Sequence, residues 1–142
     1  MMKRRGFTLI ELLAVIVILA VIMLVAGQNV FGIMGKAEKG SFRNEFLSFL
    51  DAASTAAQFD IMNGEISASK NTKCYSLSDL ADYFDQKEGY TGSVSVMYSN
   101  GNYTIKGWLS STKYIIEDKD DSLTTDDVAD SDGRAASTTC GQ

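Results

Sequence analysis

The sequence contains no histidine, no proline and only two cysteines in its 142 residues. Without histidine, the chain lacks the commonest general base and the commonest metal ligand, and it cannot form a Ser–His–Asp triad of the usual kind. It also lacks a G-x-x-x-x-G-K-[ST] phosphate loop, and Cys74 and Cys140 are too far apart in sequence for a C-x-x-C redox pair. These absences argue against an enzyme, and we expect no catalytic residue, no cofactor and no metal site.

Positive charge is scarce as well. The chain has 13 Lys and Arg residues against 18 Asp and Glu residues, which gives a formal charge of -5. Binding to nucleic acid depends on a basic surface that neutralises phosphates. We therefore expect no direct nucleic-acid site.

The apolar residues are concentrated near the N-terminus. Three basic residues, Lys3, Arg4 and Arg5, precede an apolar run from Phe7 to Ala26. A helix of this length spans about 30 Å, which matches the hydrocarbon core of a bilayer, and the basic cluster favours a cytoplasmic N-terminus. A cleaved secretory signal peptide fits poorly because the run is long and no small-x-small cleavage site follows it.

A plain signal anchor does not explain Glu11, which lies inside the apolar run. A carboxylate in lipid costs roughly 2–4 kcal/mol unless it finds a partner, and charges inside membrane segments usually mark a function. A free ammonium at a chain end is costly in the same surroundings, and each charge relieves the other in a bundle of identical helices. Glu11 is therefore a candidate assembly residue.

From Lys3 onward the sequence reads K-R-R-G-F-T-L-I-E-L. This stretch resembles the precursor signature of type IV pilins and their pseudopilin relatives. The resemblance implies that a prepilin peptidase cuts between Gly6 and Phe7, that Phe7 is then N-methylated, and that Glu11 pairs with the terminal amine of a neighbouring subunit. Loss of the leader, residues 1–6, would change the formal charge from -5 to -8. Members of this family commonly have a proline where Gln28 stands, so a proline kink is excluded here.

The resemblance also implies a location and partners. The precursor is expected in the cytoplasmic membrane as a single-pass protein with its N-terminus inside. The mature chain is expected in a homo-oligomeric helical filament at the cell surface, built by the pilus assembly machinery. Residues 7–35 would form the transmembrane and filament-core segment, and residues 36–142 would form the pilin head.

The pattern becomes amphipathic after Lys36, with Phe42, Phe46, Phe49, Leu50, Ala53, Ala57 and Ile61 on one helical face. Asn63-Gly64 is a helix stop signal. We predict one helix from Phe7 to about Asn63. Two helices broken between Gly27 and Gly35 are the alternative.

The remaining residues predict a small antiparallel sheet. Residues 93–98 and 103–108 alternate in polarity around the turn Asn100-Gly101, and a third strand is expected over 113–117. A short helix is predicted over 77–86. Together these elements predict an α+β fold of the type IV pilin kind, with the amphipathic half of the helix packed on the sheet and the hydrophobic half protruding.

The two cysteines have no metal-ligand spacing. An even number of cysteines in an exported chain predicts a disulfide, here between Cys74 and Cys140, and two free buried thiols are the alternative. Such a crosslink suits a head with a modest core.

Residues 117–132 contain eight acidic residues and one basic residue, Lys119. Clustered carboxylates suit calcium, but the full EF-hand pattern is absent, so a solvated, mobile loop held by Cys140 is the favoured interpretation.

The preferred function is a type IV pilus subunit, with adhesion, twitching motility, biofilm formation or DNA uptake as the implied roles. The alternatives are a pseudopilin of a type II secretion system and a monomeric membrane-tethered binding protein. The cysteine pair favours a pilin, because a C-terminal disulfide loop is more typical of pilins than of pseudopilins.

Overall fold

The computed structural model describes residues 7–136 and 140, apart from the side chains of Gln28, Asn29 and Phe31. The chain divides into two compact units, Met1–Ala37 and Glu38–Gln142, which we call the N-terminal unit and the head. Helix α1 (Leu9–Met62) contributes residues to both units. The head adds a five-stranded antiparallel sheet, so the predicted α+β fold is confirmed.

Helix α1 matches the predicted single helix closely. It includes Gly27, Gly32 and Gly35 and ends one residue before Asn63, so the alternative of two helices is not observed. Gly64 follows with φ of 78°, a left-handed conformation that favours glycine and ends helices.

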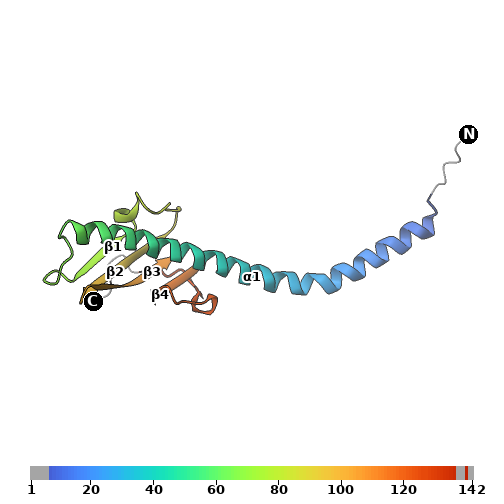
Figure 1. Ribbon diagram of the computed structural model, residues 1–142. Helices are drawn as coiled ribbons and strands as arrows, with labels where there is room; N and C mark the ends of the chain where they lie inside the picture. The colour runs from blue at the N-terminus through green and yellow to red at the C-terminus, as the bar shows by residue number, and fades with distance from the viewer. Residues whose placement is uncertain (1–6, 137–139, 141–142) are drawn as a thin grey trace, which may run out of the picture. The chain divides into compact units, whose positions relative to one another are not determined.

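The sheet consists of β1 (Thr72–Ser76), β2 (Thr91–Ser99), β3 (Asn102–Ser110), β4 (Tyr114–Lys119) and β5 (Ala129–Asp130), in the order β1-β2-β3-β4-β5. The three predicted strands correspond to β2, β3 and β4 (Figure 1). Strands β1 and β5 were not predicted. β1 is mostly polar and β5 has only two residues, so neither carries an apolar alternation.

The predicted hairpin is confirmed with its register. Tyr98 pairs with Tyr103 and Val96 pairs with Ile105 across β2 and β3. The two turn residues, Asn100 and Gly101, have φ of 52° and 83°. A two-residue turn with two positive φ angles matches the right-handed twist of the flanking strands, which is why Asn-Gly is such a strong hairpin signal.

The core of the head lies between the apolar face of α1 and one face of the sheet. Phe46 and Phe49 are fully buried on the helix side, as are Val94 and Val96 on the sheet side. Gly107 of β3 permits this close approach, because a Cβ atom there would lie 2.8 Å from Leu50 Cδ2 and 2.9 Å from Phe46 Cε2. A glycine at this position therefore leaves room for the Leu50 and Phe46 side chains between helix and strand.

The predicted helix over 77–86 is wrong. Only Ser78–Leu80 is helical, as a single 3-10 turn (η1). The Asp79 carboxylate accepts hydrogen bonds from Ser76 N and Ser76 Oγ at 2.8 and 2.7 Å, and Asp79 N donates to Ser76 Oγ at 3.4 Å. This is a reciprocal cap of the kind found at helix starts, but only one 3-10 turn follows it. The periodicity did identify buried residues, since Leu80 is buried and Phe84 packs on Phe49 with ring centroids 5.2 Å apart.

Candidate assembly site

The N-terminal unit presents an apolar helix surface. Residues Leu9–Gly27 of α1 are long and apolar enough to cross a membrane, and none of this segment is buried within the chain. Phe7, just before the helix, is 82% exposed. Gly6 lies outside the described residues. The surface therefore requires lipid or other protein chains around it.

Thr8 and Glu11 form a reciprocal cap at the start of α1. Thr8 N and Thr8 Oγ1 each donate to Glu11 Oε2 at 2.9 Å, and Glu11 N donates to Thr8 Oγ1 at 3.3 Å. This T-x-x-E arrangement is a capping box, which satisfies helix N–H groups that otherwise lack partners. Thr8 was not among the predicted site residues, although the T-x-x-E spacing is visible in the sequence.

The cap leaves Glu11 with unused hydrogen-bonding capacity. An ionised carboxylate can accept about four hydrogen bonds, and both bonds from Thr8 go to Oε2. No ion pair to Glu11 is present among residues 7–136 and 140. Glu11 is thus a negative group in an apolar segment that can still receive a cation from outside the chain.

Residues 1–27 match the family model described as the prokaryotic N-terminal methylation motif. The chain carries the N-terminal signal of type IV pilin-like proteins. This motif belongs to structural proteins that are processed by prepilin peptidase, and together with the apolar helix it fits a single-pass membrane precursor. No curated protein and no solved structure matches the chain.

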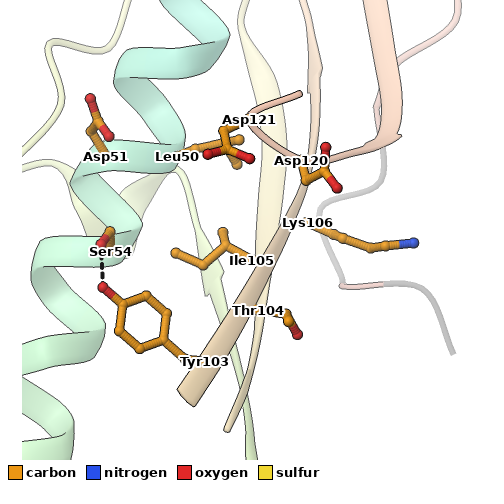
Figure 2. A pocket seen from close by; sticks show the side chains of 9 residues that line it. All are labelled: Leu50, Asp51, Ser54, Tyr103, Thr104, Ile105, Lys106, Asp120 and Asp121. Atoms are coloured by element: carbon orange, nitrogen blue, oxygen red, sulfur yellow. Dashed lines mark hydrogen bonds between the residues drawn. The ribbon is translucent and has the colours of Figure 1, made fainter. Parts of the chain in front are cut away.

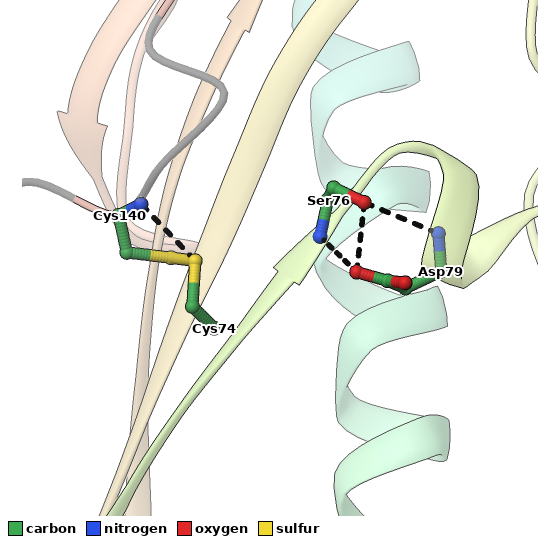
Figure 3. Close-up of a disulfide and its surroundings, with 4 residues drawn as sticks. All are labelled: Cys74, Ser76, Asp79 and Cys140. Carbon is green, nitrogen blue, oxygen red and sulfur yellow. Dashed lines mark hydrogen bonds between the residues drawn. A yellow bond between two sulfur atoms is a disulfide. The ribbon is translucent and has the colours of Figure 1, made fainter.

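The expected disulfide is present between Cys74 and Cys140, with the two Cα atoms 5.7 Å apart (Figure 3). Cys74 lies in β1, at the opposite edge of the sheet from β5. The Cys140 N–H also donates to Cys74 Sγ at 3.0 Å.

The described residues that follow β5 bond to the head near the start of β4 and the end of β3, and we call Ser131–Ala136 together with Cys140 the C-terminal strap. Ser131 N donates to Lys113 O at 2.9 Å, and Ala136 N donates to Ser110 Oγ at 2.7 Å. Ser131, Ala136 and Ser110 are all buried. The disulfide therefore fixes the far end of a segment that already has buried contacts with the sheet.

Three carboxylates of α1 are each bound by a lysine and a tyrosine from the sheet side of the head. Asp60 accepts from Tyr75 Oη at 2.5 Å and forms an ion pair with Lys73 at 2.7 Å. Glu45 is bound in the same way by Lys87 and Tyr90. Glu38 is bound by Lys113 and Tyr114. We call these three groups the polar clamps, and none of them was predicted from the sequence.

Some members of the polar clamps have shifted pKa values. Burial and the hydrogen bond to Asp60 raise the pKa of Tyr75, and burial and Glu45 likewise raise the pKa of Tyr90. Burial would raise the pKa of Asp60, but hydrogen bonds from Lys73 and Tyr75 outweigh it and lower the pKa. These contacts therefore favour the charged form of Asp60 and the neutral forms of Tyr75 and Tyr90.

The acidic segment 117–132 is not the loop that we expected. It contains the end of β4, a 3-10 turn at Thr125–Asp127 (η2) and β5, and it buries Leu123 and Val128. Arg43 Nε donates to Leu123 O at 2.8 Å and Lys39 Nζ donates to Val128 O at 3.0 Å, so α1 holds the segment against the head. Within the described part of the chain, no group of three His, Cys, Asp or Glu residues is arranged to hold a metal ion.

Proposed function

We propose that the chain is the structural subunit of a type IV pilus. The precursor is stored in the cytoplasmic membrane, cleaved between Gly6 and Phe7, N-methylated at Phe7 and polymerised into a surface filament. In this filament the apolar part of α1 exchanges lipid for the same segment of other subunits. Adhesion, twitching motility, biofilm formation and DNA uptake are the roles that such a filament serves.

The observation that supports this proposal best is the state of Glu11. Its local cap on Thr8 leaves one carboxylate oxygen without a hydrogen bond from within the described residues. The ammonium group that cleavage creates at Phe7 is the complementary charge, and it is equally costly in apolar surroundings without a partner. Pairing Glu11 of one subunit with Phe7 of another relieves both and fixes the axial register of neighbouring helices.

Pilins and pseudopilins carry the same N-terminal motif, so the motif does not separate them. The C-terminal strap supports the assignment as a pilin. A head closed by a C-terminal disulfide is more typical of pilins than of pseudopilins, and such a crosslink strengthens a small domain. Electron microscopy separates the two functions. Long fibres labelled by an antibody to the head indicate a pilus, whereas absent fibres and lost enzyme secretion on deletion indicate a pseudopilin.

The direct test of processing is mass spectrometry of the mature protein. An N-methylated phenylalanine at Phe7 is the expected N-terminus. A chain that still begins at Met1, or one that begins after Ala26, would refute the proposed processing.

Substitution of Glu11 tests its role in assembly. Glu11→Gln keeps an oxygen that accepts from Thr8 but removes the charge, so it should impair filament formation while the head stays folded. Thr8→Val is the matched control, because it removes the hydroxyl and keeps the charge of Glu11. If Glu11→Gln assembles as well as the wild type, the pairing of charges does not drive assembly.

A further inference from the structure

Half of strand β3 has a neighbour on one side only. β2 pairs with β3 along its whole length, from Asn102 to Ser110, whereas β4 pairs with it only between Gly107 and Ser110. The chain leaves the sheet after Lys119, the partner of Gly107. The stretch Asn102–Lys106 is therefore a sheet edge, which we call the β3 edge.

The register identifies the backbone groups that the β3 edge exposes. In an antiparallel ladder, alternate residues direct both their N–H and C=O groups to the same neighbour. The two-residue turn makes Ser99 and Asn102 a hydrogen-bonded pair, so Tyr103 and Ile105 direct theirs away from β2. No backbone hydrogen bond from a turn or loop reaches Tyr103 or Ile105 within the described residues.

A groove of about 520 Å³ runs beside the β3 edge. Its lining comes from Leu50, Asp51 and Ser54 of α1, from Tyr103–Lys106 of β3, and from Asp120 and Asp121 after β4. Figure 2 shows Tyr103 and Ile105 directed toward α1, with Thr104 and Lys106 directed away from it. The groove thus lies where a longer β4 would continue.

The groove carries an excess of negative charge. Asp51 and Asp121 have no ion-pair partner among the described residues, and the one lysine of the lining, Lys106, is paired with Asp118 at 3.2 Å. Sheet edges are commonly protected from other strands by lysine side chains or by proline. Here Asp118 neutralises the only lysine of the edge, and the chain has no proline.

We propose that the β3 edge binds an extended segment of a partner protein that carries Lys or Arg side chains. The segment adds one strand to the sheet by bonding to the N–H and C=O groups of Tyr103 and Ile105, as in other cases of strand addition. Small apolar side chains of the segment pack on Leu50, and basic ones meet Asp51 and Asp121. This surface is separate from the apolar part of α1 and does not depend on filament formation.

The test uses the full chain in detergent micelles and the probe peptide acetyl-Thr-Lys-Thr-Val-Thr-Lys-amide, in which Lys, Val and Lys occupy alternate positions and so share the face directed at α1. Amide hydrogen exchange at Tyr103 and Ile105 is measured with and without the peptide. Saturating peptide is expected to slow exchange at both amides about tenfold or more, because new interstrand hydrogen bonds protect them. A version with Glu in place of Lys should not bind. N-methyl groups on alternate amides give two versions of the peptide. The version whose methylated amides face the β3 edge should lose binding, and the other should keep it.

Variants of the chain test the charge argument. Asp51→Asn combined with Asp121→Asn should weaken binding of the lysine peptide about fivefold, as expected for two exposed ion pairs. Asp82→Asn is the matched control, since Asp82 is exposed and does not line the groove. The proposal is overturned if the lysine peptide protects neither amide or if the glutamate peptide binds equally well. Protection that increases with the concentration of the chain alone would also overturn it, because a second copy would then be the occupant.

Discussion

The bond between Cys74 and Cys140 should contribute a large part of the stability of the head. The two residues are 66 positions apart, and closing a loop of that size in the unfolded chain stabilises the folded state by about 4 kcal/mol in the chain-entropy model. A domain the size of the head has a free energy of unfolding of about 5–15 kcal/mol. The double variant Cys74→Ser, Cys140→Ser should therefore lose between a quarter and most of that free energy.

The strap itself contributes separately from the crosslink. Ser110 Oγ accepts the buried N–H of Ala136 at 2.7 Å. Ser110→Ala keeps the disulfide but leaves that N–H without an acceptor, which costs about 1–3 kcal/mol. Comparing this variant with the double cysteine variant separates the effect of the crosslink from that of the strap contacts.

Urea denaturation of the full chain in detergent measures both effects. Trp108 is the only tryptophan, lies in β3 of the head and is half-buried, so its fluorescence reports unfolding of the head. A loss of about 4 kcal/mol should lower the midpoint by about 1.5 to 4 M urea. Adding a reductant to the wild type should produce the same shift, and adding it to the double variant should change nothing. If the reduced wild type unfolds at the oxidised midpoint, the assignment of stability to the crosslink is refuted.

Four further predictions concern the head. Gly92→Ala should destabilise it by about 2 kcal/mol or more, because the new Cβ would lie 2.4 Å from the backbone oxygen of Trp108, which cannot move aside easily. Gly107→Ala should destabilise it less, because the new Cβ meets only side chains. Melting temperatures of the two variants test this difference. Stability should fall in acid as pH drops from about 4 towards 2, because hydrogen bonds from Lys119 and Thr124 lower the pKa of Asp127 to about 2, and Asp127→Asn should lessen that loss. Stability should also fall as pH rises above about 10, because Tyr90 has a raised pKa in the folded head, and Tyr90→Phe should lessen that loss in alkaline melting curves. A calcium titration should leave the melting temperature unchanged, and a rise would show that the acidic segment binds the ion.

The sequence predicted those elements whose local pattern agrees with their tertiary surroundings. The long helix and the Asn100-Gly101 hairpin have strong signals of their own, and the structure contains both. Strand β1 lacks such a signal. Its Lys73 and Tyr75 side chains are held by Asp60 of α1, a contact that the local sequence does not reveal. The acidic segment was misjudged for the same reason, because Arg43 and Lys39 hold it through backbone carbonyls that no sequence pattern reveals.

Among the candidate site residues, too, only those with an unusual local sequence were predicted. Glu11 was found because a single carboxylate in an apolar run is unusual on composition alone, whereas its bonds to Thr8 required the structure. The polar clamps each join residues at least 13 positions apart, so periodicity within one element does not report them.

The polar clamps distinguish three carboxylates of α1 from Glu11. Glu38, Glu45 and Asp60 of α1 each have a lysine and a tyrosine from the head, so their charges are balanced within the subunit. Glu11 has only the neutral bonds from Thr8, in the segment where an unbalanced charge is most costly. In the proposed pilus, the chain balances these three helix carboxylates internally and leaves Glu11 unbalanced, so its strongest demand for an external cation is at Glu11. Glu11→Gln should therefore impair assembly and leave the head stable. Lys113→Ala, which removes one lysine of a polar clamp, should lower the stability of the head and leave assembly intact.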